Sequence, residues 1–225
     1  MATRGQLREL CRRRLGDTGD SVHWSDLQIN QWINDALADI SNYFPAQREY
    51  TLALAIGTRK YGLSSHLVNP RAILKVEYPV DEDPPAYLEY RDIHDTRGLY
   101  GDYYAVIGTP PSEIILGPDD WGVGDTVVIT YLGDHDYPEE DSDTITLPDK
   151  LLELVVLFVR MAALQEQADT ETQDPRVTTL IVGSLGLNAS RAEREYRTKV
   201  AEYQRLLEPG SQTASWKIDA WDRVY

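Results

Sequence analysis

The sequence of 225 residues has little of what a reactive or metal-binding site requires. Cys11 is its single cysteine, which excludes an internal disulfide and a cluster of thiolate metal ligands. The four histidines are scattered without paired ligand spacing, and the sequence contains no glycine-rich phosphate loop, nucleophile elbow or metalloprotease motif. We therefore predict a protein that is not an enzyme and that has no cofactor and no metal ion.

Long apolar runs are also missing. The longest, Leu151 to Leu164, is too short to cross a bilayer and contains Glu153 and Arg160. Residues 1–14 are basic and lack the apolar segment of a signal peptide. We expect a protein that is made in the cytoplasm and has no membrane partner.

The net charge of −15, from 22 basic and 37 acidic residues, is distributed unevenly. Residues 81–143 contain 17 acidic residues but only two basic ones, Arg91 and Arg97, and the remaining residues contain 20 of each kind. Phosphate-driven nucleic-acid binding requires clustered lysines and arginines, which this segment lacks. The simplest explanation of the acidic segment is a solvated surface that aids solubility.

The first predicted helix, Ala2 to Leu15, has an apolar stripe that includes Leu7, Leu10 and Cys11. Basic residues surround this stripe, namely Arg4, Arg8, Arg12, Arg13 and Arg14. Such a set of arginines forms either a solvated or salt-bridged helix face, or a patch that contacts acidic groups of a neighbour or DNA phosphate.

The second predicted helix begins at Ser25 and ends near Tyr43. Ser25 and Gln28 have the spacing of a capping box, and Asp26 places negative charge at the positive end of the helix dipole. Pro45 disfavours helical geometry in the residue before it. Apolar residues recur at helical spacing between these limits, at Leu27, Ile29, Ile33, Leu37 and Ile40.

From Glu49 to Leu147 the apolar period approaches two, which indicates strands. We expect residues 50–54 and 59–63 to form a hairpin, and residues 103–107 and 113–116 to flank a turn. Further strands are predicted at 71–78, 86–90 and 126–131. Short strands at this spacing are typical of a small antiparallel sandwich or open barrel.

Helical periodicity returns after Pro148, first to Gln167 and then in a long helix opened by Asp174 and Pro175. Pro209 and Gly210 end that helix. Residues 211–225 are polar at first and then rich in aromatic residues, which is unusual for a disordered tail. The tail either folds back on its own sheet or binds a partner, and we favour a partner because aromatic and Arg residues are common interface anchors.

Two groups of carboxylates need a separate explanation. Asp119 and Asp120 lie between Gly117-Pro118 and Trp121-Gly122, a context typical of a solvated turn. The segment from Asp134 to Asp143 has enough carboxylates for a calcium ion but lacks the glycine and the flanking helices of an EF-hand. We favour a solvated acidic loop over a calcium site.

The layout of the chain resembles that of the head-to-tail adaptor (head completion or connector) proteins of tailed bacteriophages and gene transfer agents. Three segments carry the resemblance. They are Arg14-Leu-Gly-Asp17 with Trp24-Ser-Asp26 and Trp32-Ile-Asn-Asp-Ala36, Glu113-Ile-Ile-Leu-Gly-Pro118 leading into Thr126-Val-Val-Ile-Thr-Tyr131, and Leu147-Pro148 leading into the apolar helix.

The resemblance implies an α+β fold in which N-terminal helices (1–46) and long C-terminal helices (148–208) form a helical bundle. An acidic antiparallel β module (47–147) is inserted between them, and an extended tail (209–225) binds a partner. Proteins of this kind form a homo-oligomeric ring, usually dodecameric, at the head–tail junction of the virion. The ring binds the portal protein, extends the channel through which DNA passes without sequence-specific binding, and provides the attachment surface for the tail or a further connector.

Residue roles follow from the same resemblance. The tail residues expected to contact the portal are Trp216, Ile218, Trp221, Arg223, Val224 and Tyr225. The subunit interface is expected to include Arg8, Arg12, Arg13 and Arg14. The acidic module either lines the DNA channel, where it would repel the duplex, or faces outward and keeps the ring soluble.

Two other functions are compatible with the sequence. A carbohydrate-binding or adhesion module on a β scaffold would use exposed aromatic residues as stacking platforms, although tyrosines in a small sheet are usually packing residues. The candidates for that platform are Tyr87, Tyr90, Tyr100, Tyr103, Tyr104 and Trp121. A hydrolase would use Asp119 and Asp120, but adjacent carboxylates do not by themselves lie across a substrate.

Overall fold

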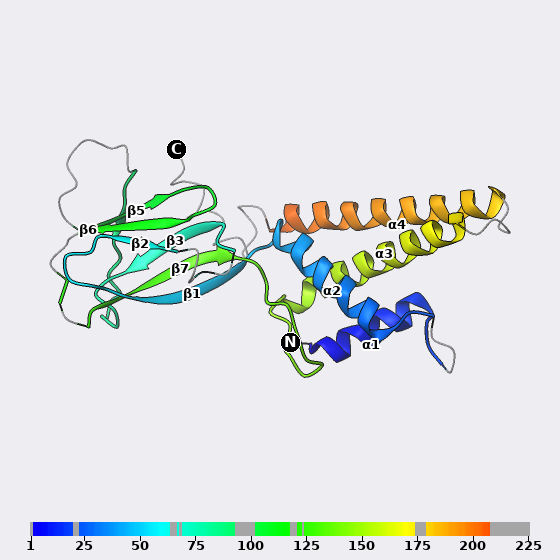
Figure 1. Ribbon diagram of the computed structural model, residues 1–225, viewed down its shortest axis with the longest axis horizontal. Coiled ribbons are helices and arrows are strands. Elements are labelled where there is room, and N and C mark those ends of the chain that lie inside the picture. Colours follow the sequence, from blue (N-terminus) through cyan, green and yellow to red (C-terminus); the bar gives the residue numbers. More distant parts are fainter. Residues whose placement is uncertain are drawn as a thin grey trace. The chain divides into compact units, whose positions relative to one another are not determined.

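The computed structural model describes residues 2–19, 23–63, 67, 69–92, 102–117, 121–122, 124–173 and 179–207. Within these residues the chain is an α+β protein with four α-helices and two β-sheets (Figure 1). None of the described helices is both long enough and apolar enough to cross a membrane.

The chain divides into two compact units. The helical unit comprises Met1–Phe44 and His135–Glu208, and the β unit comprises Pro45–Asp134. The helical unit therefore resumes at residue 135, whereas the sequence predicts a change at residue 148. Residues 135–147 belong with the helices because Ile145 and Leu147 are buried in the helical core and Thr3 forms a β-bridge with Thr144.

Local capping sets both N-terminal helices. α1 (Arg4–Leu15) has a capping box formed by Thr3 and Gln6, and it ends at Gly16, which adopts a left-handed conformation with φ of 73°. α2 (Asp26–Ser41) has the predicted capping box, in which Ser25 and Gln28 each accept a hydrogen bond from the other's backbone N–H. The predicted start of α2 is confirmed.

The C-terminal helices are α3 (Leu152–Gln173), preceded by the short 3-10 helix η1 (Asp149–Leu151), and α4 (Thr179–Leu206). α3 and α4 lie side by side along their lengths, and α3 also contacts α1 and α2 (Figure 1). Asp174 and Pro175, the predicted cap of α4, lie outside the described residues.

The helices share one hydrophobic core. It contains the predicted stripe of α2 apart from Leu27, which is exposed, together with residues of α1, α3 and α4. Cys11 is in this core, and burial raises the pKa of its thiol to about 12, so the thiol is protonated at neutral pH. The largest fully buried side chains of this core are Leu7, Ile29, Ile33, Leu37, Ile40 and Ile145.

The β unit contains two sheets. In one, β7 (Thr126–Gly133) lies between β1 (Ala46–Ala53) and β3 (Ala72–Glu77), with both pairs antiparallel. The other has the order β2 (Lys60–Gly62), β6 (Glu113–Gly117), β5 (Tyr103–Ile107) and β4 (Glu89–Tyr90), with β4 and β5 parallel.

The strand pairing agrees with one predicted pair of segments around a turn and contradicts the one predicted hairpin. β5 and β6 pair antiparallel, as predicted for residues 103–107 and 113–116. Residues 50–54 and 59–63 do not form a hairpin, because β1 pairs with β7 and β2 pairs with β6. The turn between β1 and β2 instead connects the two sheets. Apolar side chains of both sheets pack in one core, which includes Val76, Tyr104, Ile114, Leu116, Val127 and Ile129.

Candidate assembly surfaces

The basic residues of α1 divide into buried and exposed members. Arg12 is buried, and its guanidinium donates to Asp17 Oδ2 at 2.6 Å, to the Trp24 carbonyl at 2.9 Å and to Asp26 Oδ1 at 2.5 Å. Asp17 is also buried and accepts hydrogen bonds from the backbone N–H groups of His23 and Trp24. Arg12 therefore ties the end of α1 to the start of α2.

Arg4 and Arg8 bind the acidic loop that precedes η1. Arg8 Nη2 donates to Asp141 Oδ2 at 2.6 Å, and Arg4 Nη2 donates to Asp141 Oδ1 at 3.0 Å. The hydrogen bonds from Arg8, and to a smaller extent those from Arg4, lower the pKa of the Asp141 carboxyl to about 2. Asp141 thus neutralises part of the basic face of α1.

The remaining arginines of α1 are on the surface. Arg13 and Arg14 are exposed, and neither forms an ion pair with a described residue. Of the four arginines predicted for a subunit interface, Arg8 and Arg12 hold the helical unit together, while Arg13 and Arg14 are available to a neighbour. Sequence periodicity places all four around the apolar stripe but does not reveal which have acidic partners in the same chain.

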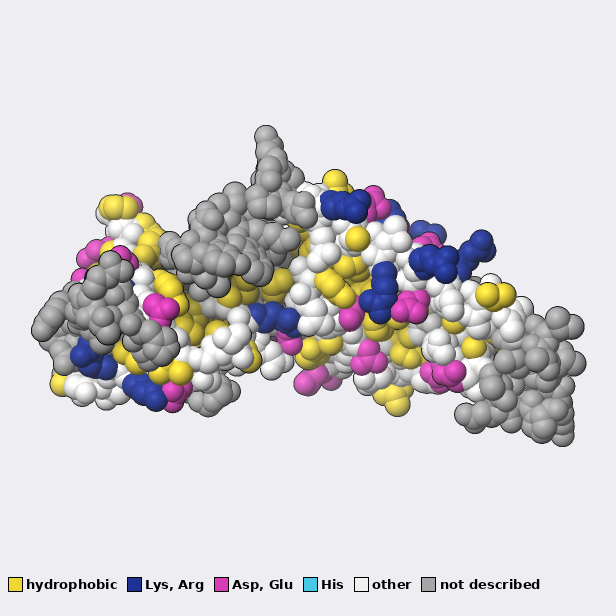
Figure 2. Space-filling model, turned by 90° about the horizontal axis from the view of Figure 1, so that it is seen from above, with side chains coloured by type: hydrophobic (Ala, Val, Ile, Leu, Met, Phe, Trp, Pro, Cys, Tyr) yellow, Lys and Arg dark blue, Asp and Glu magenta, His cyan; other side chains and the backbone are white. Residues whose placement is uncertain are grey.

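The outward face of α4 is a second candidate surface of the helical unit. Between residues 183 and 206 it includes the exposed side chains of Leu187, at 73%, and Leu206, at 56%. Over α4, Figure 2 shows Lys and Arg side chains next to Asp and Glu side chains, with hydrophobic ones between them. An open hollow runs along this face and is lined by Ser190, Glu193, Arg194, Arg197, Thr198, Ala201, Glu202, Arg205 and Leu206.

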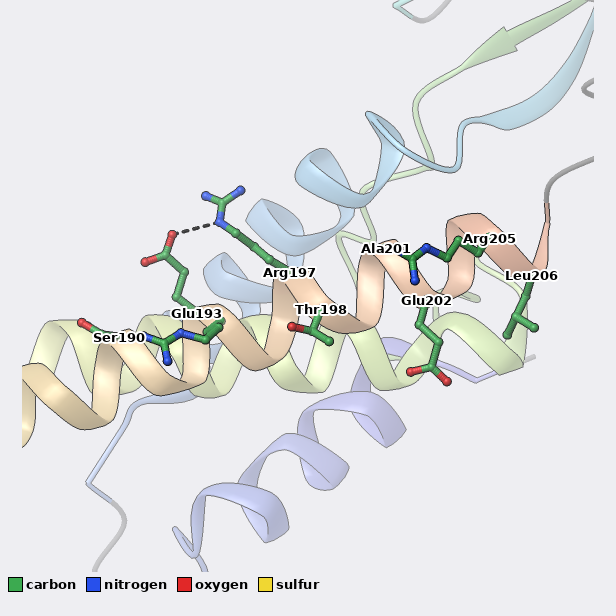
Figure 3. Close-up of a pocket in the computed structure, with 9 residues that line it drawn as sticks. Ser190, Glu193, Arg197, Thr198, Ala201, Glu202, Arg205 and Leu206 are labelled. Atoms are coloured by element: carbon green, nitrogen blue, oxygen red, sulfur yellow. Dashed lines mark hydrogen bonds and ion pairs between the residues drawn. The ribbon is translucent and has the colours of Figure 1, made fainter.

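The hollow is lined by both small and charged residues. Ser190, Thr198 and Ala201 recur at helical spacing. Arg197 projects to one side and donates to Glu193 at 3.0 Å, whereas Glu202 points to the other side (Figure 3). Arg194 lies one turn from both Ser190 and Thr198, so the face is a mixture of small and charged positions, and a partner helix could form ion pairs with it.

The acidic segment from Asp134 to Asp143 is bound by donors of the protein itself. Asp134 accepts from Arg71 Nη2 at 2.6 Å and from Asn69 Nδ2 at 2.9 Å. The backbone N–H groups of Glu140 and Glu139 donate to Asp143 and lower the pKa of its carboxyl. Within the described residues no three His, Cys, Asp or Glu side chains gather where they could hold a metal ion.

His135 connects the two segments of the helical unit. Its backbone N–H donates to Ser41 Oγ at 3.0 Å, and its Nε2 lies 2.9 Å from the Phe44 carbonyl oxygen. A carbonyl only accepts, so Nε2 carries the proton of this hydrogen bond. Nδ1 lies 3.0 Å from Thr146 Oγ1. The sequence gives no sign of this role, because the partners of His135 are distant along the chain.

The proposed aromatic platform for carbohydrate is not assembled by the described tyrosines. Tyr103, Tyr104 and Trp121 are buried, and Tyr104 and Trp121 pack in the core between the sheets. Tyr87 and Tyr90 are exposed. Tyr100 lies outside the described residues, as do Asp119 and Asp120, the carboxylates of the hydrolase alternative.

The residues predicted to contact the portal also lie outside the described part of the chain. They are Trp216, Ile218, Trp221, Arg223, Val224 and Tyr225. Their role remains a prediction from composition and resemblance.

Comparison with protein families gives one result. The model of the SU10 adaptor protein family matches residues 2–215, which is nearly the whole chain and covers both compact units. No individual curated protein matches the chain.

Proposed function

The chain belongs to the SU10 adaptor protein family, a family of phage head–tail adaptors, and on that premise we propose that it is a virion structural protein that forms a ring between portal and tail. The ring, a dodecamer in this proposal, extends the DNA channel and provides the surface to which the tail or a further connector attaches. The family match over nearly the entire chain is the observation that supports this function. Kinship with the connectors of gene transfer agents is part of the same proposal.

We assign the contact between subunits to the outward face of α4, together with Arg13 and Arg14. This face combines exposed Leu187 and Leu206 with small residues and charges of both signs. Interfaces in closed rings are heterologous, so each subunit must offer two different surfaces. A partly apolar, partly charged helix face suits a contact that forms only when subunits are concentrated on a portal.

We assign portal attachment to the tail, residues 209–225. Its polar first part is a linker in composition, and its second part provides two tryptophans, an arginine and a tyrosine, the residue types enriched among interface hot spots. The alternative, in which the tail covers its own sheet, predicts that removing it destabilises the β unit.

The acidic surface of the β unit is proposed to border the DNA channel. Residues 81–134 contain twelve acidic and two basic residues, whereas the acidic residues from 136 to 143 belong to the helical unit. Carboxylates would repel phosphate within a Debye length, about 8 Å at physiological ionic strength, and so keep passing DNA from adhering. A ring reconstruction with these carboxylates on the outer rim would contradict this assignment.

The experiment that tests the function combines the purified chain with the portal protein of the same phage. We expect rings of the chain on the portal in negative-stain images and a defined stoichiometry by native mass spectrometry. A chain ending at Pro209 should keep the unfolding midpoint of the full chain and lose attachment. Absence of any complex between the full chain and its portal would refute the proposed function, and cosedimentation of the truncated chain would refute the role of the tail.

A further inference from the structure

Three helices of the helical unit each contribute one arginine to a second hollow. Arg14 lies in the last turn of α1, Arg160 in α3 and Arg191 in α4. The hollow has a volume of about 370 Å³, and its apolar lining includes half-buried Leu164 and buried Ala192. It is distinct from the outward face of α4, with which it has no lining residue in common.

The hollow carries more positive than negative charge. Its single lining carboxylate is Glu195, whose Oε2 lies 3.4 Å from Arg160 Nη1. Arg14 and Arg191 form no ion pair with a described residue. Among the lining residues, three guanidinium groups thus stand against one carboxylate, and the like charges of Arg14 and Arg191 repel each other. An anionic group that entered the hollow would relieve this repulsion.

The size and chemistry of the hollow favour carboxylate side chains over a nucleic acid. A volume of this size admits one or two side chains but not a DNA duplex. Guanidinium groups bind carboxylates through paired, charge-assisted hydrogen bonds, and arginines from three directions can enclose one acidic turn.

The chain itself carries an acidic turn of the required kind. Asp81, Glu82 and Asp83 are consecutive and exposed, and none of these carboxylates forms an ion pair with a described residue. The turn follows β3 in the β unit, where the chain reverses direction between Glu77 and Tyr87, which form an antiparallel bridge. It lies within the acidic segment that gives the chain its net negative charge.

We propose that the hollow formed by Arg14, Arg160 and Arg191 binds the acidic turn Asp81–Asp83 of a second copy of the chain. A surface of the helical unit then meets a surface of the β unit of the next copy. Such a contact joins different patches and is therefore heterologous, the type that closes into a ring. The proposal deepens the proposed ring, but the binding between turn and hollow can be measured without a portal.

The direct test uses the full-length chain labelled with ¹⁵N and a synthetic peptide with the sequence of residues 78–87. We expect saturable shifts of the Nε–Hε resonances of Arg14, Arg160 and Arg191. Arg191→Gln should weaken peptide binding roughly tenfold, because it removes one charge-assisted hydrogen bond between guanidinium and carboxylate. Lys150→Gln is the control, since Lys150 is an exposed cation of η1 that lines neither the hollow nor the outward face of α4, and it should leave binding unchanged.

A peptide with Asp81→Asn, Glu82→Gln and Asp83→Asn should not bind. Equal binding of this neutral peptide, or no shift of the three arginines by the acidic one, would overturn the proposal. Shifts of the same resonances by a short DNA duplex, but not by the acidic peptide, would also overturn it and identify a phosphate site.

A charge exchange tests the contact in the assembled protein. Arg191→Glu should prevent ring formation on the portal, and adding Glu82→Lys in the same chain should restore it. Failure of the double variant to assemble, where the wild-type chain does assemble, would count against the contact. If the wild-type chain itself forms no ring, the proposed function fails, while the peptide titration still decides the binding between turn and hollow.

Discussion

Arg12 of α1 and Asp17 of the following loop form an ion pair, with 2.6 Å between Nη1 and Oδ2, and the two side chains are only 9% and 5% exposed. Asp17 also accepts two backbone N–H groups from the residues that lead into α2. The pair therefore fixes the connection between the first two helices, and its removal tests how strongly that connection supports the helical unit.

Asp17→Ala should lower the free energy of unfolding by about 1.5–3 kcal/mol, because Arg12 loses one of its two carboxylate partners and the backbone N–H groups of His23 and Trp24 lose their acceptor. Urea denaturation followed by circular dichroism measures this loss. Arg13→Ala, an exposed neighbour, should change stability by no more than about 0.5 kcal/mol. Equal behaviour of the two variants would mean that the ion pair does not stabilise the fold.

Asp141 should make stability depend on pH in the acidic range. Its pKa in the folded chain is lowered to about 2, so the ionised form is favoured by folding. The resulting stabilisation is fully present above the pKa of an unfolded aspartate, about 3.9, and is lost as the pH falls towards 2. Asp141→Asn removes the titrating group. The difference in unfolding midpoint between wild type and this variant should therefore be constant from pH 7 to pH 5 and shrink below pH 4, and a constant difference down to pH 2 would contradict the assignment.

Gly117 of β6 is required for close packing against Tyr103. A methyl group at this position would overlap the buried Tyr103 ring, at 2.7 Å from Cδ1. The ring cannot easily move, because Arg59 Nη2 donates to its Oη at 2.7 Å. Gly117→Ala should therefore cost about 1–3 kcal/mol of stability by overpacking. Gly62→Ala in the same sheet has open space around its new methyl group and should be neutral or slightly stabilising in the same denaturation experiment.

Local signals explain what the sequence predicted correctly. The capping box of Ser25 and Gln28 involves residues three apart, and the β5–β6 hairpin joins neighbouring segments, so both can be read from short windows of sequence. The pairing of β1 with β7 places Tyr50 opposite Ile129, which is distant along the chain. A short window of sequence contains no information about such a pairing.

The partners of the charged residues on the candidate surfaces could not be predicted from short windows of sequence either. A helix with five arginines is typical of a solvated face, yet Arg12 is buried because Asp17 and Asp26 approach it from outside α1. The hollow of Arg14, Arg160 and Arg191 was not predicted because its members are up to 177 positions apart and meet only when α1, α3 and α4 pack together. Charge content can be read from the sequence, whereas the pairing of charges depends on tertiary structure.

The outward face of α4 gives the sharpest test of ring assembly. Ala201 is exposed in the middle of this face, and replacing it with Trp adds bulk where we propose that a neighbouring subunit packs. Because the position is exposed in the single chain, Ala201→Trp should change the free energy of unfolding by no more than about 0.5 kcal/mol. Ring occupancy on the portal, counted in negative-stain images, should fall roughly tenfold, which corresponds to about 1.4 kcal/mol of lost contact energy per subunit.

Thr51→Trp is the control for the added tryptophan. Thr51 is also exposed, on β1 of the β unit, and this variant should assemble normally. Complete rings of the Ala201→Trp variant would place the outward face of α4 outside the contacts between subunits.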